Sequence, residues 1–293
     1  MKISVVIPTY NSSKTIVRTL ESVFKQTYNS YEVIVVDDGS TDDTVQLLAR
    51  FKDKITLFCQ PNSGAAAARN QGVKLSQGDL IAFLDSDDLW HPQKLEFQVA
   101  VFDKHADLGI LSTRFQTVRE ANFTNDVAQQ EIPLENLRFE LISFDDVFLE
   151  PFLATPTVML KRSLFESLGG FNESLITAED VDLWLRSCYA AKYALIENEL
   201  CTVIQQENSL TYRAAYSPFL AHLDVIEAFC KKNEAFERDH RLLINTAKSS
   251  IYTCIASAEL CLNKKQDARK NLLTAIKLRA SFRSIYLLLK TFI

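Results

Sequence analysis

Short apolar runs that stop abruptly at polar residues recur through this sequence. They occupy residues 3–7, 32–36, 55–59, 80–84, 109–113 and 156–160. Runs this short suit buried strands better than helices. Residues at helical spacing separate the first four runs. Strands that alternate with helices over such short distances predict right-handed crossovers and a mostly parallel sheet flanked by helices. The fold class is therefore α/β, with a Rossmann-like first half.

The run at residues 80–84 ends in three carboxylates, Asp85, Asp87 and Asp88. In open α/β sheets, ligands bind at the carboxyl ends of the strands, where these acids lie. Clustered carboxylates repel one another unless a cation shares them, and their oxygens suit Mg²⁺ or Mn²⁺, which can hold phosphates in turn. The alternative is that one acid merely caps a helix opened by Pro92. That alternative needs one acid, and three are present.

Other features narrow the classes of function. No glycine-rich phosphate loop of the GxGxxG or Walker type occurs, so a phosphate-bearing ligand would be held through the metal. The net charge of −5 argues against nucleic acid as a partner, because a surface that follows phosphates needs basic residues in excess. The chain has no run of about 18 apolar residues, and its cysteines lack zinc-like spacing. We therefore expect a cytoplasmic protein with reduced thiols.

The pattern changes in the second half of the chain. Residues 117–146 are polar with weak periodicity, and we expect a loop-rich segment there. A later helix carries Glu179 and Asp180 in its first turn, where the helix dipole favours acids whatever their role. From about residue 217 the pattern is continuously helical, and residues 250–278 look like one helical hairpin of tetratricopeptide type.

Five motifs follow one another at the ends of these elements. They are SVVIPTYN at residues 4–11, VVDDGS at 35–40, GxxxxRNxG at 64–72, LDSDD at 84–88 and EDxDLWxR at 179–186. Together they resemble the family 2 inverting glycosyltransferases of the GT-A fold, over residues 2–212. The resemblance implies transfer of a sugar from a nucleoside-diphosphate sugar, preferably a UDP-sugar, to an acceptor hydroxyl in cell-surface glycan or polysaccharide synthesis.

The resemblance also implies roles for residues at the donor site. The nucleotide-binding positions are Pro8, Thr9, Tyr10, Asp37, Asp38, Arg69, Asn70, Asp85 and Ser86. Asp87 matches the metal-binding position of the DxD motif. The metal, Mn²⁺ or Mg²⁺, would bridge both phosphates and stabilise the leaving diphosphate.

Asp180 matches the general base of the family, which takes a proton from the acceptor hydroxyl. Glu179 would raise the pKa of Asp180 or orient the acceptor. Gln206 stands where many relatives place a His that binds the metal or the diphosphate. A Gln can donate to a phosphate but is a poor metal ligand. We expect Trp184 to belong to the core or to form a platform for the acceptor, and Arg186 to pair with a nearby acid.

The motifs divide the chain into a catalytic domain at 1–215 and a helical region at 216–293. The catalytic domain has a nucleotide-sugar half at 1–115 and an acceptor half at 116–215. Two other functions are considered. A sugar nucleotidyltransferase also uses paired acids, but its glycine- and arginine-rich loop is absent. A non-catalytic nucleotide-sugar binder would act through its helical tail, and Gln206 mildly favours it.

The helical tail is basic. From Arg241 onward the sequence has ten Lys or Arg residues and two acids, Glu259 and Asp267. Residues 281–293 have two interpretations. They would lie peripherally on the anionic inner surface of the membrane, where lipid-linked acceptors are found, or they would pack on the catalytic domain or on a second subunit of a homodimer. The basic residues are scattered, which slightly favours packing.

Overall fold

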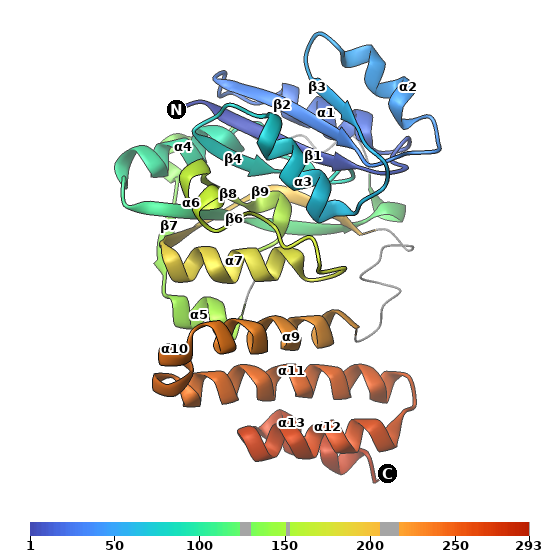
Figure 1. Cartoon of the computed structure of the whole chain (residues 1–293), viewed down its shortest axis with the longest axis vertical. Coiled ribbons are helices and arrows are strands. Elements are labelled where there is room, and N and C mark those ends of the chain that lie inside the picture. The colour runs from blue at the N-terminus through green and yellow to red at the C-terminus, as the bar shows by residue number, and fades with distance from the viewer. Residues whose placement is uncertain (124–129, 151–152, 206–216, 293) are drawn as a thin grey trace. The chain divides into compact units, whose positions relative to one another are not determined.

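The computed structural model describes residues 1–123, 130–150, 153–205 and 217–292. The chain divides into two compact units (Figure 1). The first comprises Met1–Phe144 and Phe152–Glu207, and the second comprises Asp145–Pro151 and Asn208–Ile293. A short segment from the middle of the chain thus belongs to the same unit as the C-terminal helices.

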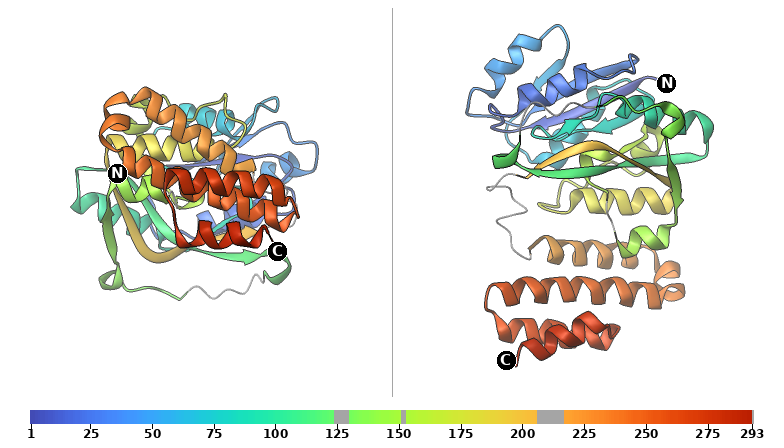
Figure 2. Two further views of the ribbon diagram at one scale, coloured as in Figure 1. Left: turned by 90° about the horizontal axis from the view of Figure 1, so that it is seen from below. Right: turned by 180° about the vertical axis from the view of Figure 1, so that it is seen from behind.

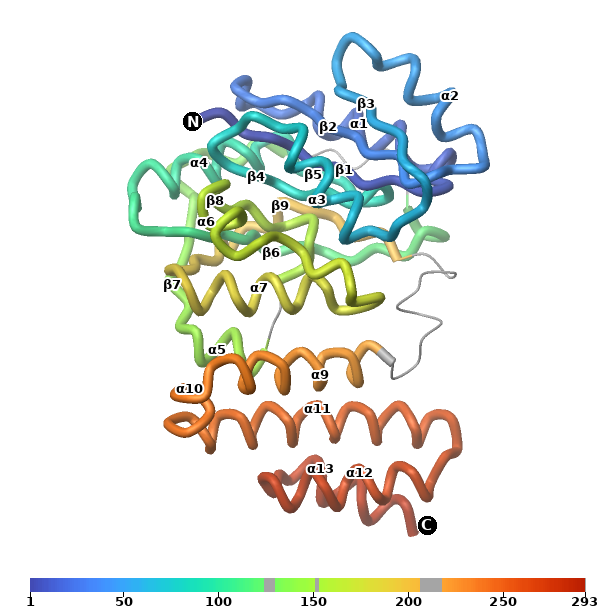
Figure 3. The backbone as a smooth tube through the Cα atoms, in the orientation of Figure 1, coloured from blue at the N-terminus to red at the C-terminus, as the bar shows by residue number. Residues whose placement is uncertain are grey.

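A nine-stranded sheet forms the centre of the first unit within the described residues (Figure 3). Its strands are β1 (Ile3–Thr9), β2 (Tyr31–Asp37), β3 (Thr56–Cys59), β4 (Leu80–Phe83), β5 (Leu89–Trp90), β6 (Leu108–Arg119), β7 (Phe139–Ile142), β8 (Met159–Lys161) and β9 (Lys192–Gln205). Their order is β3-β2-β1-β4-β8-β6-β9-β5, with β7 also paired to β9. The stretch from β3 to β4 is parallel, whereas β8 runs antiparallel to both of its neighbours.

Helices cover both faces of this sheet. They are α1 (Ile16–Phe24), α2 (Thr44–Leu48), α3 (Ala65–Leu75), α4 (Lys94–Lys104), α6 (Arg162–Ser167) and α7 (Glu179–Ala190). Side chains alternate between the two faces of a strand. Accordingly, Val5 of β1 packs in one cluster with residues of α1 and α4, while Phe83 of β4 meets Phe171 and Trp184 on the other face. The continuous apolar strands are therefore buried on both sides.

Helix α3 approaches the sheet closely because its inner face carries small side chains. Ala68 lies in a buried cluster with Ile34 and Val36 of β2. A Cβ atom at Gly72 would collide with the Val6 side chain of β1. The alanine-rich sequence of this helix thus fixes its distance from the sheet, and with it the position of Arg69 on the same helix.

The α/β fold class predicted from the sequence is confirmed, with a parallel first half and a mixed second half. The expectation of a loop-rich segment at 117–146 is wrong in part. The segment contains the end of β6, the edge strand β7 and the start of α5 (Phe144–Leu149). β7 has only half-buried and exposed residues, so its apolar periodicity is weak. The strand expected at 156–160 begins later, because residues Thr155–Thr157 form a 3₁₀ turn, η4.

The second unit is helical. Its elements include α9 (Ser217–Lys232), α10 (Glu234–Asp239), α11 (Arg241–Cys261), α12 (Lys265–Leu278) and α13 (Phe282–Lys290). Figure 2 shows α9, α11 and α12 side by side, with α13 next to α12. Ala256 of α11 meets Ala268 and Leu272 of α12 in a buried cluster. A helical hairpin is therefore present where the sequence predicts one, although α11 begins earlier, and its likeness to a tetratricopeptide repeat stays a prediction.

In the part of the chain that the structure describes, no helix combines the length and apolarity needed to span a bilayer.

Candidate functional site

The carboxyl ends of three neighbouring strands bring the first motifs together. β1 lies between β2 and β4, and Thr9 at its end is opposite Asp37 in the register. Asp85 directly follows Leu84, whose amide donates to the Val6 carbonyl of β1. The turn after β1, the acids after β2 and the acid cluster after β4 therefore share one edge of the sheet, which is the edge where such folds bind ligands.

The two loops at this edge are joined by hydrogen bonds. Asn11 adopts a left-handed conformation, with φ of 50°. Its side-chain oxygen accepts from the amides of Thr41 and Asp42, at 2.8 and 3.3 Å. The Ser12 amide donates to Thr44 Oγ1 at 2.8 Å. The loops are thus fixed to each other, while Tyr10 between them is half-exposed and free to meet a ligand.

The acids Asp37 and Asp38 have different surroundings although both are buried. The Asp38 carboxylate accepts from Gln60 and from the amides of Ser63 and Gly64, at 2.8 to 2.9 Å. Asp38 therefore holds the chain that enters α3. Asp37 accepts from the Ser40 amide through Oδ2, but its Oδ1 finds no partner among the residues that the structure describes.

A second unpaired atom lies across from Asp37. Among the described residues, the buried atoms without a hydrogen-bond partner include Thr9 Oγ1 as well as Asp37 Oδ1. Buried polar groups are nearly always satisfied, so each exception needs an explanation. Two such atoms at the ends of adjacent strands indicate a position for a polar ligand.

The polar residues that follow β4 have different hydrogen-bond partners. Asp88 is 4% exposed and accepts from the Ile204 amide of β9 at 2.8 Å, so it ties two strands together. Neither Asp85 nor Asp88 caps α4, whose N-cap residue is Gln93. Ser86 shares a hydrogen bond with Ser12 at 2.7 Å. The capping alternative is therefore wrong, because the acids turn toward the sheet edge instead.

Asp87 lies in a strongly negative environment. Burial, followed by the neighbouring charge of Asp85, raises the pKa of Asp87 to about 6, and Arg18 of α1 opposes this shift. Arg18 forms a bidentate pair with Glu120, with distances of 2.9 and 2.8 Å. Its buried Nε atom has no partner among the described residues. Glu120 also contributes to the raised pKa, so the Arg18–Glu120 pair is part of the surroundings of Asp87.

Arg69 of α3 connects the acid cluster to α7. Its Nη2 lies 2.7 Å from Asp85 Oδ1, and its Nη1 lies 2.8 Å from Glu179 Oε1. The guanidinium also lies over the Phe171 ring, 5.4 Å from the ring centre. Although burial alone would lower the pKa of Arg69, the two carboxylates raise it above its ordinary value. Arg69 therefore stays charged and joins two motifs that are distant in sequence.

The start of α7 presents the second pair of acids. Ala178, directly before the helix, has a left-handed conformation with φ of 61°, which strains a residue with a Cβ. Burial raises the pKa of Glu179, against the opposing effect of Arg69. Asp180 accepts from the Thr155 hydroxyl at 3.1 Å and from the Val181 amide at 2.8 Å. The Asp180 carboxylate is thus held in one orientation.

The η4 turn that carries Thr155 is held by side chains of β5 and α4. The Trp90 indole donates to the Pro156 carbonyl at 2.7 Å, and the Gln98 amide donates to the Thr157 carbonyl at 3.0 Å. Lys94, fully buried, donates to Gln98 at 2.8 Å. These contacts make Thr155 a rigid donor to Asp180. The sequence reasoning missed Thr155 because it placed residues 156–160 in a strand.

Two predicted structural roles in α7 are confirmed. Trp184 is 1% exposed and packs on Phe83 and Phe171. Arg186 pairs with Asp182 at 2.6 Å and also donates to backbone carbonyls. Both residues therefore serve the core and the shape of α7.

The structure brings most of the predicted residues to the sheet edge, but not all. The Asn70 side chain donates to the Phe171 carbonyl and to Glu173, and accepts from the Phe171 amide, so it holds that turn. Pro8 is buried within β1. Gln206 lies outside the described residues. Arg18 and Glu120, which surround Asp87, were not predicted, since neither belongs to a motif.

The carboxylates fit a divalent cation only with help from a ligand. Within the described residues, no group of three or more His, Cys, Asp or Glu side chains is arranged to hold a metal. Asp85 is already paired with Arg69. Mg²⁺ and similar ions are commonly held by one or two carboxylates together with substrate phosphates and water. Asp87 fits that mode, in which the phosphates of a ligand complete the site.

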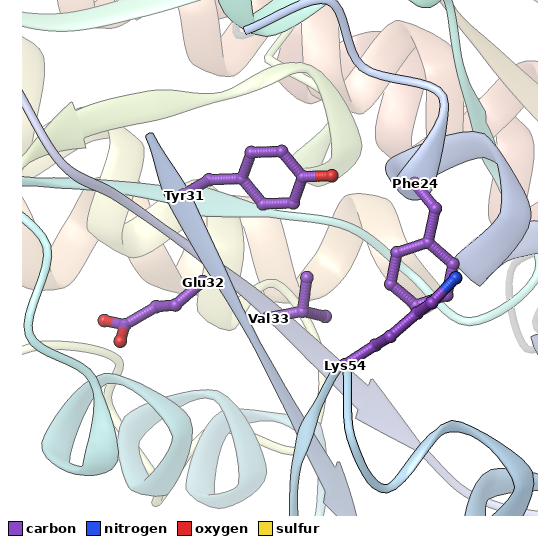
Figure 4. Close-up of a pocket in the computed structure, with 5 residues that line it drawn as sticks. All are labelled: Phe24, Tyr31, Glu32, Val33 and Lys54. Carbon is purple, nitrogen blue, oxygen red and sulfur yellow. The ribbon is translucent and has the colours of Figure 1, made fainter. Parts of the chain in front are cut away.

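A hollow elsewhere in the first unit lies away from this edge (Figure 4). It has a volume of about 300 Å³ and is lined by Phe24, Tyr31, Glu32, Val33 and Lys54. Tyr31 begins β2 whereas Asp37 ends it. The hollow is therefore at the opposite end of that strand and contains none of the predicted site residues.

Comparisons with known proteins agree with this arrangement. The family model described as "Glycosyl transferase family 2" matches residues 4–169. A curated relative, the UDP-Glc:alpha-D-GlcNAc-diphosphoundecaprenol beta-1,3-glucosyltransferase WfgD of Escherichia coli, is 33% identical over 62% of this chain and 68% of its own length. The chain spans about 30% of the length of several other curated relatives.

Two solved structures share the fold. TarS 1-349 of S. aureus, in complex with UDP-GlcNAc, has a TM-score of 0.64 at 19% identity, covering 95% of this chain and 89% of its own. The mannosyltransferase PcManGT of Pyrobaculum calidifontis, in complex with GDP-Man and Mn²⁺, has a TM-score of 0.63 at 19% identity, covering 99% and 79%. These likenesses establish the fold, and the family match covers more than half of the sequence. The chain belongs to glycosyl transferase family 2.

Proposed function

We propose that this protein is an inverting glycosyltransferase that moves a sugar from a nucleoside-diphosphate sugar to an acceptor hydroxyl. The observation that carries this proposal is the position of Arg69, which contacts both Asp85 and Glu179. Through this one residue, the acid cluster expected to bind the donor lies next to the acid pair expected to activate the acceptor. Both halves of a transfer reaction are then available at one sheet edge.

The donor nucleotide is proposed to be UDP. Uracil presents one ring N–H donor, and Asp37 offers one unused buried oxygen to accept it. Its other oxygen is occupied by the Ser40 amide, which disfavours a guanine that would offer two donors to one carboxylate. The name of the E. coli relative includes UDP-Glc, and TarS was solved with UDP-GlcNAc. Tyr10, half-exposed at the same edge, would flank the base.

Asp180 is proposed as the general base. Its carboxylate would take the proton of the acceptor hydroxyl while that oxygen forms a bond to the anomeric carbon and the bond to the diphosphate breaks. Attack from the face opposite the diphosphate inverts the anomeric configuration. The hydrogen bonds from Thr155 and the Val181 amide support this role, because they hold the carboxylate in place before the substrate arrives.

Asp87 is proposed to hold a divalent cation jointly with the donor phosphates. When bound, Mn²⁺ or Mg²⁺ would neutralise the charge that develops on the departing diphosphate. The structure of the Pyrobaculum mannosyltransferase with GDP-Man and Mn²⁺ supports a metal in this fold. Asp85 is paired with Arg69, so it would bind a cation less readily than Asp87.

The acceptor is proposed to be a growing cell-surface glycan or a lipid-linked sugar at the cytoplasmic face of the membrane. The E. coli relative is named for a diphosphoundecaprenol-linked acceptor, which supports this class. The proposal is tested by incubating the protein with UDP-sugars, Mn²⁺ and a panel of lipid-linked and soluble saccharides, and by measuring UDP release together with the product.

The anomeric configuration of the product, read by NMR, reports inversion directly. Asp180→Asn should abolish turnover, since an amide cannot accept the proton. Asp107→Asn is the control, because Asp107 pairs with Lys192 in an ion pair whose two side chains are more than half exposed. Its loss should leave turnover within a few-fold of the original. A retained configuration, or full activity in Asp180→Asn, would contradict the proposed mechanism. UDP binding without turnover would favour the non-catalytic binder instead.

A further inference from the structure

The last described helix of the second unit, α13, carries an exposed apolar stripe. The side chains of this stripe recur at the spacing of one helix face. Their exposed fractions are 87% for Phe282, 45% for Ile285, 48% for Tyr286, 61% for Leu289 and 67% for Phe292. The Phe282 and Tyr286 rings are nearly parallel, with their centres 6.5 Å apart. This stripe is the set of residues 282, 285, 286, 289 and 292.

The opposite face of α13 is already packed. Ser284 is buried and forms a capping box with Ser281. Leu287 and Leu288 pack on the buried cluster of α11 and α12. Thr291 is 3% exposed and accepts from Arg269. The stripe therefore faces away from the core of its own unit, and stable folding of the hairpin does not require it.

The segment that contains the stripe is rich in basic residues, and two of them lie beside it. Between residues 264 and 290 the sequence contains eight of them, namely Lys264, Lys265, Arg269, Lys270, Lys277, Arg279, Arg283 and Lys290, against one acid, Asp267. Lys290 lies 4.8 Å from the centre of the Tyr286 ring, and Arg269 lies 4.0 Å from that of Phe292. Positive charges thus lie directly beside the apolar side chains.

We propose that the stripe on α13 binds the surface of an anionic lipid bilayer, with its aromatic and aliphatic side chains at the boundary between headgroups and acyl chains. Apolar side chains flanked by Lys and Arg are the arrangement that interfacial helices use. Long basic side chains reach the lipid phosphates while their stems cover apolar surface. This binding does not require the proposed transferase activity, although it would bring the protein to lipid-linked acceptors.

A second copy of the chain fits the stripe less well. Pairing two stripes face to face would bring Arg269 and Lys290, which lie beside the stripe, close to the same residues of the other copy. Like charges brought together in this way oppose association. An anionic surface instead attracts the basic residues beside the stripe. Charge complementarity therefore selects lipid over self-association.

The test measures partition of the full chain onto sucrose-loaded vesicles by sedimentation. Vesicles rich in phosphatidylglycerol should bind the protein, and vesicles of pure phosphatidylcholine should bind it at least about tenfold less. Raising the salt concentration should weaken binding to the anionic vesicles without abolishing it, because the apolar contacts remain. Equal binding to both vesicles, or none to either, would overturn the proposal.

Variants locate the contact. Phe282→Ser combined with Leu289→Ser should reduce partition by about tenfold or more, since two exposed apolar side chains are lost. The matched control is Leu242→Ser combined with Leu262→Ser, which removes two apolar side chains that are 68% and 49% exposed and lie outside the stripe. Circular dichroism verifies that each variant is folded. Equal losses in the control and in the stripe variant would contradict the assignment.

A fluorescence measurement gives an independent readout. Trp90 and Trp184 are both buried, so their emission does not report on solvent at α13. Phe282→Trp should shift its emission to the blue when anionic vesicles are added, while UDP release stays unchanged. Analytical ultracentrifugation without lipid should show no self-association through α13. A stripe-dependent dimer with no shift on vesicles would assign the stripe to a second copy and overturn the lipid proposal.

Discussion

Arg69 Nη1 of α3 lies 2.8 Å from Glu179 Oε1 of α7, across 110 positions of sequence. The same guanidinium lies 2.7 Å from Asp85. Arg69 is 6% exposed, so the guanidinium is shielded from solvent. The side chains of Asp85 and Glu179 are 31% and 15% exposed. It fixes the distance between the acid cluster at the sheet edge and the acid pair on α7, which is the distance that a sugar-transfer site would have to keep constant.

Replacing Arg69 tests how much the site depends on this contact. Arg69→Ala should lower the free energy of unfolding by about 3 to 5 kcal/mol, because Asp85 and Glu179 would be left close together without a counter-charge. Arg69→Lys should recover part of the stability and little of the activity, since one ammonium cannot bridge both acids in the plane of a guanidinium. Urea unfolding followed by tryptophan fluorescence gives the first quantity and UDP release the second.

An exposed ion pair provides the control for Arg69. Lys192 lies 2.6 Å from Asp107, and both side chains are more than half exposed. Lys192→Ala should leave both the urea-unfolding transition and UDP release nearly unchanged. A similar loss for Arg69→Ala and Lys192→Ala would mean that the bridge has no special role.

Thr155 is expected to act by positioning Asp180. Thr155→Val keeps the shape of the side chain but removes the donor at 3.1 Å from the carboxylate. The turnover number should fall about tenfold, while the KM for the donor should stay constant because Thr155 does not touch the nucleotide edge. Thr155→Ser should restore turnover. Equal changes in KM and turnover, or no rescue by Ser, would show that the residue is only structural.

The two acids after β2 should respond differently to the same substitution. Asp37→Asn replaces an unused carboxylate acceptor by an amide, which can present a donor to the N–H of uracil. UDP binding should therefore weaken by about 10- to 100-fold with little loss of stability. Asp38→Asn should mainly lower stability, because Gln60, Ser63 and Gly64 donate to that carboxylate. Calorimetric titration and thermal unfolding separate the effects. The reverse pattern would assign the contact with uracil to Asp38.

Lys94 should give the stability of the first unit a pH dependence. Burial lowers the pKa of Lys94 to about 7, below its value in an unfolded chain. Above pH 7 the unfolded state binds a proton that the folded state has lost, so stability rises with pH, by up to about 1.4 kcal/mol per pH unit from this group. The gain should be visible from pH 7 to about 8.5, before buried thiols oppose it.

Lys94→Met should remove this slope. The buried Cys188 and Cys201 have raised pKa values because of burial, and they act in the opposite direction at higher pH. Unfolding in urea at several pH values from 7 to about 8.5 therefore isolates the lysine. An unchanged slope in the variant would show that Lys94 is charged throughout this range in the folded protein.

The sequence predicted the residues at the sheet edge well, because the end of each apolar run is visible from neighbouring residues alone. The apolar runs of β1, β2 and β4 end at Thr9, Asp37 and Asp85, and parallel strands necessarily align such ends. The helix that carries Asp180 was found for the same reason. The confirmed family match agrees with these motifs.

The sequence could not predict which atoms are already used. Asp37 and Asp38 are adjacent residues of the same type. Only their surroundings leave Asp37 with an unpaired oxygen among the described residues. Asn70 belongs to a motif, yet long-range contacts direct it to the turn at Phe171. Thr155 donates to Asp180 from a turn whose geometry depends on Trp90. Such pairings depend on tertiary packing between segments far apart in sequence.

Isothermal titration of the protein with UDP, with and without Mn²⁺, tests the central claim most directly when Asp87→Ala and Asp180→Asn are measured alongside. The account predicts Mn²⁺-dependent binding that Asp87→Ala abolishes and Asp180→Asn retains, because Asp87 serves the donor phosphates and Asp180 serves the acceptor. Binding that ignores Mn²⁺ and survives Asp87→Ala would contradict the metal-assisted donor site. No binding of UDP, GDP or dTDP under any condition would contradict the donor site altogether.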